Sequence, residues 1–201
     1  MSDDPTRVRE FFGARAAGWD SRFPDDGPAY AAAVSELGLR PGDAVLDAGC
    51  GTGRALPPLR TAVGPSGTVL GADLTPEMLD QAAGAGRGGA DGGTLLLADV
   101  GRLPVRDGAL DAVFGAGLIS HLAEPLADLR ELARVVRPGG RLALFHPIGR
   151  AALAARHGRQ ITPDDLRAEP RLRPLLAEAG WRLVGYVDED TRFLAVAVRE
   201  D

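Results

Sequence analysis

The 201-residue sequence contains no lysine, so all 23 of its strongly basic residues are arginine. The chain therefore offers neither a Schiff-base lysine nor the phosphate-binding lysine of a P-loop. Cys50 is the single cysteine, which excludes an internal disulfide and a cysteine-based metal cluster. The three histidines are not grouped with acidic residues, and we predict no metal site.

Long hydrophobic runs are also absent. No apolar run approaches the roughly 18 residues needed to cross a bilayer, and the polar N-terminus lacks the apolar stretch of a secretory signal. We therefore expect a cytoplasmic protein without a membrane partner. The net charge is −5 and no basic stripe stands out, which argues against a nucleic-acid partner. Arg130, Arg134 and Arg137 recur at helical spacing and are interpreted as a solvated helix face.

The length fits one domain, which we divide into an N-terminal helical cover (1–42) and a core (43–201). Residues 5–38 have a helical pattern that is interrupted by Gly13, Gly18 and a turn-forming segment at 24–28. The aromatic residues of this region either pack on the core or form part of a lid over an acceptor; they are Phe11, Phe12, Trp19 and Tyr30.

From residue 43 onward, short apolar runs alternate with helical patterns, which predicts parallel strands joined by right-handed crossovers. A final pair of strands is separated by only four residues and must form an antiparallel hairpin. The fold class is therefore an α/β sheet of seven strands, five parallel strands followed by the hairpin. The predicted strands are 44–48, 67–72, 94–98, 110–115, 141–146, 181–187 and 192–199, and the predicted helices are 54–63, 76–83, 125–136 and 171–179.

A glycine-rich loop follows the first predicted strand, with Gly49, Gly51 and Gly53 at alternate positions. Such a loop lets a ligand approach the backbone closely at the carboxyl end of a strand. A dinucleotide-binding loop would have its third glycine where Arg54 stands. Asp47, just before the loop, would repel a diphosphate and attract a ligand with a positive ammonium or sulfonium group.

Two further acidic residues end the next two strands. Asp73 is placed to accept the hydroxyls of a ribose, and Asp99 is placed to accept from an exocyclic amine. Apolar side chains nearby are suited to the two faces of an adenine ring; they are Leu74, Met78, Val100 and Leu103. The three carboxylates together outline one elongated ligand with an ammonium, a ribose and an aminopurine.

With these residues the chain resembles the class I S-adenosylmethionine-dependent methyltransferases, whose fold is a Rossmann-like doubly wound sheet. The matching segments occur in family order and cover most of residues 43–146. They are VLDAGCGTG (45–53), GADLTPEML (71–79), LADV (97–100), LPVRDGALDAVFGAGLISHL (103–122) and ELARVVRPGGRL (131–142). One departure is Pro57-Pro58 within the first core helix, which must begin late or be kinked.

The resemblance implies S-adenosyl-L-methionine as cofactor and a role for each matching residue. Gly49 and Gly51 would contact the methionine portion and ribose through their backbone, beside Cys50 as a small residue of a crowded loop. Asp73 would hold the ribose hydroxyls and Leu74 would pack on the adenine, near Met78. Asp99 would accept from the adenine amine, the Val100 N–H would reach a ring nitrogen, and Gly115 and Ala116 would border the methionine.

Histidines are the candidates for proton transfer to or from an acceptor. His121 follows the fourth strand and His146 ends the fifth, so both are candidate catalytic bases at the cleft. The alternative for each is a partly buried structural histidine. His157 lies in a segment that we expect to be exposed.

The family resemblance does not name the acceptor. The tetrapeptide Gly115-Ala116-Gly117-Leu118 stands where nucleobase amino-methyltransferases carry Asn-Pro-Pro-Tyr or Asp-Pro-Pro-Tyr, and residues 147–170 allow only a modest lid. We therefore predict a small-molecule acceptor methylated on O, N or C, with the oligomeric state open. Two alternatives remain, an S-adenosylmethionine-binding protein without methyl transfer, such as a cyclase, and an NAD(P)-dependent oxidoreductase.

Overall fold

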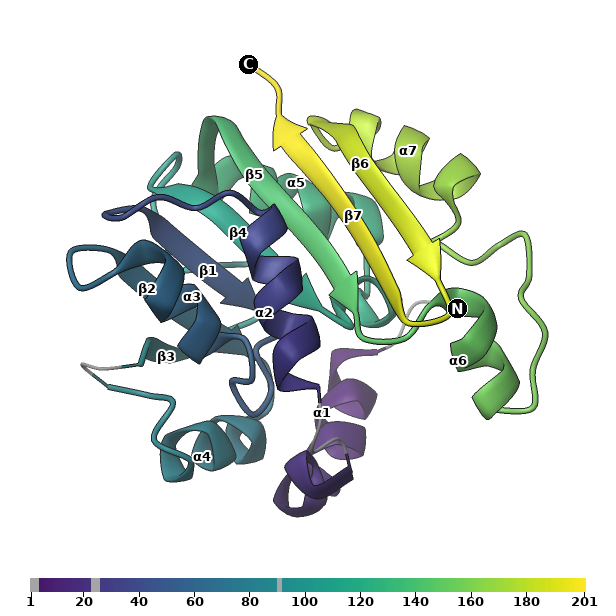
Figure 1. The fold of residues 1–201 in the computed structure, drawn as a ribbon, viewed down its shortest axis with the longest axis horizontal. Coiled ribbons are helices and arrows are strands. Elements are labelled where there is room, and N and C mark those ends of the chain that lie inside the picture. The colour runs from purple at the N-terminus through teal and green to yellow at the C-terminus, as the bar shows by residue number, and fades with distance from the viewer. Residues whose placement is uncertain (1–3, 23–25, 90–91) are drawn as a thin grey trace.

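The computed structural model describes residues 4–22, 26–89 and 92–201, and contains one seven-stranded mixed sheet with the strand order β3-β2-β1-β4-β5-β7-β6 (Figure 1). The strands β1 to β5 are parallel, and β7 is antiparallel to both β5 and β6. The predicted five parallel strands and terminal hairpin are therefore confirmed. The strands are β1 (Ala44–Ala48), β2 (Thr68–Asp73), β3 (Thr94–Leu97), β4 (Leu110–Ala116), β5 (Val136–His146), β6 (Trp181–Glu189) and β7 (Arg192–Arg199).

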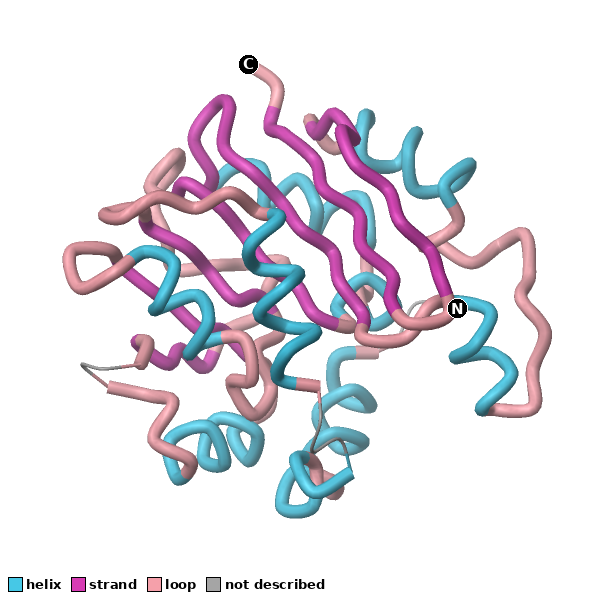
Figure 2. The backbone as a smooth tube through the Cα atoms, in the orientation of Figure 1, coloured by secondary structure: helices cyan, strands magenta, loops and turns pink. Residues whose placement is uncertain are grey.

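Helices cover both faces of this sheet, as the all-apolar strands require. Figure 1 shows α2 and α3 in front of the sheet, with α5 and α7 behind it. Figure 2 shows the same layers with the helices in cyan against the magenta strands. The helices are α1 (Pro5–Gly13), α2 (Gly27–Glu36), α3 (Leu56–Val63), α4 (Pro76–Gly84), α5 (Pro125–Val135), α6 (Arg150–Arg156) and α7 (Glu169–Glu178), with short 3-10 turns η1 (Ala16–Gly18), η2 (Asp20–Arg22) and η3 (Leu118–His121).

Each face of the sheet has its own core, because successive side chains of a strand point to opposite faces. Val45 of β1 and Phe114 of β4 pack with α2 and α3. Leu46, the residue after Val45, and Val113, the residue before Phe114, pack with α5 and α7 on the other face. The alternation explains why these strands are apolar throughout.

The first core helix begins late, which is one of the two outcomes allowed by its prolines. Helix α3 starts at Leu56 rather than at residue 54, so Pro57 and Pro58 lie in its first turn. A proline is tolerated there because the N–H groups of the first turn have no partner within the helix. The helix therefore needs no kink.

Strand β5 is longer than predicted because residues 136–140 also belong to it. Val136 pairs with Leu110, whereas Arg141 pairs with Ala112, so the intervening residues bulge out of register. The regular pairing covers 141–146, the range predicted from the sequence. Of the predicted turn at 24–28, residues 24 and 25 lie outside the described residues.

Candidate functional site

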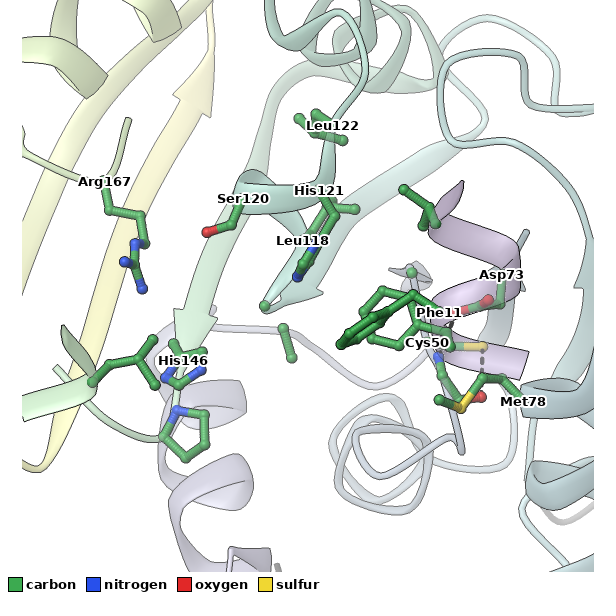
Figure 3. A pocket seen from close by; sticks show the side chains of 18 of the residues that line it. Phe11, Cys50, Asp73, Met78, Leu118, Ser120, His121, Leu122, His146 and Arg167 are labelled. Atoms are coloured by element: carbon green, nitrogen blue, oxygen red, sulfur yellow. Dashed lines mark hydrogen bonds between the residues drawn. The ribbon is translucent and has the colours of Figure 1, made fainter. Parts of the chain in front are cut away.

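A cavity of about 1070 Å³ opens at the carboxyl edge of the parallel strands, where the glycine loop, the N-terminal helices and the segment after β5 meet (Figure 3). This edge is where open α/β sheets bind their ligands. Gly115 does not line the cavity, because it lies within β4 with Leu118 against its α-carbon. Leu103, predicted to face the adenine ring, does not line the cavity either and is buried in the core. The other predicted site residues do line it, namely Asp47, Gly49, Cys50, Gly51, Asp73, Leu74, Met78, Asp99, Val100, Ala116, His121 and His146.

The glycine loop needs its glycines for conformation and for space. Gly49, Gly51 and Gly53 have φ angles of 66°, 53° and 78°, in the left-handed region that disfavours other residues. A side chain at Gly49 would come within 3.1 Å of Leu118. The N–H of Cys50 donates to Ala72 O at 2.9 Å, which ties the loop to the end of β2.

Asp47 is the most unusual group in the cavity. Its side chain is 1% exposed, and among the described residues neither carboxylate oxygen has a hydrogen-bond partner. Burial, assisted by the nearby charge of Asp73, raises the pKa of Asp47 to about 8. Buried acceptors without a donor are rare in folded proteins, so this carboxyl group is suited to a ligand that brings its own N–H donors.

Asp73 links the end of β2 to the glycine loop. Its Oδ2 accepts from the Gly51 N–H at 2.7 Å, and its Oδ1 accepts from the Thr75 N–H at 2.8 Å. Burial raises the pKa of Asp73, and these backbone N–H groups oppose the shift. Each carboxylate oxygen accepts more than one hydrogen bond, so both still have capacity for hydroxyl groups of a ligand.

Asp99 follows β3 and is exposed, with its Oδ1 accepting from the Gly101 N–H at 2.9 Å. Beside it lies Asp128 of α5, a buried carboxylate that the sequence reasoning missed. Asp128 accepts from the Glu124 N–H at 3.1 Å, and burial together with the charge of Asp99 raises its pKa. The only signal in the sequence was a single acidic residue among the buried positions of α5.

Both predicted histidines line the cavity, as Figure 3 shows. His146 Nδ1 lies 2.8 Å from Ile148 O and 3.1 Å from Ile148 N, and burial lowers the pKa of the imidazole. His121 ends η3 and stacks edge-on against Phe12, with 5.1 Å between ring centroids. His157 is exposed at the rim, as predicted.

The N-terminal cover is fastened to the glycine loop by Asp20. Its Oδ1 accepts from Thr52 Oγ1 and its Oδ2 accepts from Arg87 Nη1, both at 2.6 Å. Phe12 and Trp19 of the cover contact one another and line the cavity. The cover therefore packs on the core and also forms one wall of the cavity. The two interpretations of its aromatic residues, core packing and a boundary of the acceptor region, are thus compatible.

The segment after β5 forms the opposite wall. It contains α6, and its far end is fixed by an ion-pair network in which Asp165 binds Arg167 at 3.0 Å and Arg150 at 3.7 Å. Arg150 also binds Asp188 at 2.8 Å. The segment that we expected to allow a modest lid is thus anchored on β6 by Arg150 and Asp188.

Among residues 4–22, 26–89 and 92–201, no group of three or more His, Cys, Asp or Glu side chains is placed to hold a metal ion. Over the same ranges, no helix combines the length and apolar character needed to span a membrane.

Comparison with known proteins yields one matching family, described as a methyltransferase domain, over residues 46–144. An arsenite methyltransferase from Halobacterium salinarum is 30% identical over 78% of this chain and 42% of its own length. A ubiquinone/menaquinone biosynthesis C-methyltransferase from Bdellovibrio bacteriovorus is 36% identical over 56% of this chain and 47% of its own length. The chain thus spans less than half of either relative.

A solved structure matches over nearly the whole chain. The crystal structure of an S-adenosylmethionine-dependent methyltransferase from Aquifex aeolicus is 27% identical, with a TM-score of 0.72, and the match covers 98% of this chain and all of the other. Both the helical cover and the terminal hairpin therefore fall within the matched region.

Proposed function

This chain belongs to the class I S-adenosylmethionine-dependent methyltransferases, and we propose on that basis that it transfers the methyl group of S-adenosylmethionine to a small-molecule acceptor. The cofactor would lie along the carboxyl ends of β1 to β3, and the acceptor would lie between the N-terminal cover and the segment after β5. The observation that carries this proposal is the buried carboxyl group of Asp47, which has no donor within the described residues and faces a cavity beside a glycine loop.

The residues of this cavity fit the cofactor group by group. Asp47 offers two unused acceptor oxygens to the ammonium group. Asp73 keeps acceptor capacity for the ribose hydroxyls while the Gly51 and Thr75 N–H groups hold it in place. Asp99 would accept from the adenine amine, and Leu74 and Met78, which line the same cavity, would contact the ring.

When bound, the cofactor supplies a methyl group on a positively charged sulfur, which is already activated for displacement. The protein therefore has to orient the acceptor and exclude water. Phe12 and Trp19 close one side of the cavity and shield it from solvent. His146 remains neutral at neutral pH because its pKa is lowered, so it is suited to removing a proton from an acceptor.

The small size of the acceptor is supported by the volume of the cavity, about 1070 Å³ for cofactor and acceptor together. The acceptor region is bounded on one side by the cover and on the other by the segment after β5. The relatives named above act on arsenite or take part in quinone biosynthesis, as their names state.

Calorimetry with S-adenosylhomocysteine, the demethylated product, tests the proposal directly. We expect micromolar binding by the protein and a loss of at least tenfold in Asp47→Ala, whose side chain has no acceptor. Asp80→Ala, at an exposed position of α4, is the matched control and should bind normally. Tight binding of NAD(P) without binding of S-adenosylhomocysteine would instead support an oxidoreductase.

A further inference from the structure

Aspartates predominate at one end of the cavity and arginines at the other, although Arg54 also lines it beside the glycine loop and Asp164 and Asp165 also line the arginine end. Four aspartates gather at its cofactor end, and within the described residues none of them has an arginine or histidine partner within 4 Å. Their hydrogen bonds, where present, come from backbone N–H groups and, for Asp73, also from the Thr75 side chain. This end of the cavity is therefore acidic, and burial raises the pKa of three of its four carboxyl groups. Its residues are Asp47, Asp73, Asp99 and Asp128.

The opposite end carries positive charge, although the whole chain has a net charge of −5. Residues 147–167 contain four arginines and two aspartates, and three of these arginines line the cavity. In the part of the chain that the structure describes, Arg156 and Arg159 form no ion pair and are exposed toward the cavity rim. Like charges that gather without counterions are costly unless a ligand neutralises them.

Arg167 extends this positive end into the cavity. Its Nε and Nη2 donate to Asp165, and its side chain is only 14% exposed. Figure 3 shows it on the same side of the cavity as Ser120 and His146, away from Asp73. Asp165 is shared with Arg150, so one carboxylate faces two guanidinium groups at this end.

Apolar side chains from the same segment as these arginines and from the cover also line the cavity. Leu153 and Ile161, which is 49% exposed, belong to that segment, and Phe11, which is 47% exposed, and Phe12 belong to the cover. Large apolar groups left partly exposed within a cavity mark a surface that binds an apolar ligand. The acceptor end therefore combines apolar side chains with two guanidinium groups, those of Arg156 and Arg159, that form no ion pair within the described residues.

We propose that the methyl acceptor is a hydrophobic acid, whose apolar body packs against Phe12, Leu153 and Ile161 while its anionic group is bound by Arg156, Arg159 and Arg167. The proposal rests on the proposed function, since it concerns the acceptor region of the same cavity. Guanidinium groups bind carboxylates through paired, charge-assisted hydrogen bonds, which neutral or cationic acceptors cannot provide. The two ends of the cavity would thus select a cationic cofactor and an anionic acceptor.

The test is a ligand-observed NMR screen of protein saturated with S-adenosylhomocysteine. The library consists of small aromatic and aliphatic carboxylic acids, each paired with its primary amide of the same shape. We expect acids to outnumber their amides among the binders and to bind at least tenfold more tightly in matched pairs. In the Arg156→Gln/Arg159→Gln double variant this preference should disappear, because the guanidinium charges are gone while the apolar side chains remain.

Arg182→Gln is the control, since Arg182 is an exposed arginine on β6 that does not line the cavity. It should keep the preference for acids. Binding of S-adenosylhomocysteine should be unchanged in the double variant, and a loss there would mean that these arginines bind the cofactor, which overturns the proposal. Equal numbers of acids and amides among the binders, or a preference that survives in the double variant, would overturn it as well. If S-adenosylhomocysteine does not bind the unmodified protein, the proposed function itself fails.

Discussion

The N–H of Gly51 donates to Oδ2 of Asp73 at 2.7 Å, so the glycine loop after β1 is held by the carboxylate that ends β2. The other oxygen of Asp73 accepts from the Thr75 N–H, at the start of α4. One side chain therefore fixes the loop and the adjacent helix entry, and the same side chain faces the cavity. Its removal should affect both binding and stability.

We expect Asp73→Ala to weaken binding of S-adenosylhomocysteine by at least tenfold and to lower the free energy of unfolding by about 1–3 kcal/mol. The second effect arises because two buried N–H groups lose their acceptor. Calorimetry and urea denaturation measure the two quantities. Asp73→Asn keeps one acceptor oxygen, so its affinity and its free energy of unfolding should lie between those of Asp73→Ala and of the unmodified protein. Asp80→Ala should match the unmodified protein in both. Normal binding by Asp73→Ala would contradict the assignment of Asp73 to the ribose.

The strands could be predicted to within a few residues because buried parallel strands are apolar on both faces. The positions of the site residues at the carboxyl ends of these strands could be predicted as well, because the carboxyl ends of parallel strands share one edge of the sheet. Asp47, Asp73 and Asp99 therefore converge on one cavity as expected. The start of α3 was placed two residues early because the adjacent prolines allow either a late start or a kink.

The residues missed by sequence reasoning act across long chain separations. Asp20 holds Arg87 and Thr52 from the N-terminal cover, and Asp128 reaches the cavity from α5. Neither has a local pattern that distinguishes it from a surface carboxylate. Arg134 was interpreted as solvated, but it donates to Glu131 and to Asp107, as well as to two backbone carbonyls. Only the folded chain brings these groups together.

The raised pKa of Asp47 predicts how stability depends on pH in the cofactor-free protein. The pKa is about 8 in the folded protein, against 3.8 without the influence of the fold, so the folded state binds more protons between these values. Asp47 should therefore lower the free energy of unfolding as pH rises from about 4 to about 8. Asp73, whose pKa is shifted in the same direction, contributes with the same sign.

Asp47→Asn removes this group from the titration. We expect the variant to be more stable than the unmodified protein at pH 8 and nearly equal to it at pH 4. Urea denaturation at a series of pH values measures the difference, with Asp80→Asn as a matched control for loss of one carboxylate. If the free energy of unfolding of Asp47→Asn depends on pH as steeply as that of the unmodified protein, Asp47 is ionised in the folded protein throughout this pH range.

The same carboxyl group should link cofactor binding to proton release. Below pH 8 it is largely protonated in the free protein, and an ammonium group beside it favours the ionised form. At pH 7, binding of S-adenosylhomocysteine should release up to one proton. Calorimetry in phosphate and in Tris, whose ionisation enthalpies differ, measures that number. Asp47→Asn should bind with the same enthalpy in both buffers, and identical enthalpies in the unmodified protein would refute the linkage.

Because Asp20 holds the N-terminal cover on the core, its replacement should make the cover more mobile. In Asp20→Ala both hydrogen bonds to Thr52 and Arg87 are lost, while no core residue is altered. Amide hydrogen exchange in residues 5–22 should become at least several-fold faster, and exchange in β1 and β4 should stay unchanged. Ser21→Ala, which removes only a hydroxyl donating to Gly18 O, is the control. Unchanged exchange in Asp20→Ala would show that the aromatic contacts alone hold the cover.

The environment of His146 predicts that its imidazole is neutral near neutral pH, which is the form that can accept a proton. Burial lowers the pKa of the imidazole below 6.5, since the positive form loses hydration at the end of β5. NMR titration of the ring C–H signals, assigned with His146→Gln, should give a midpoint below 6.5. The folded state then resists protonation, so His146 should cost stability as pH falls through 6.5, and His146→Gln should be less sensitive over that range. A midpoint above 6.5 would contradict the lowered pKa, and a midpoint well above 7 would leave the ring mostly charged at neutral pH, where it could not act as the proton acceptor.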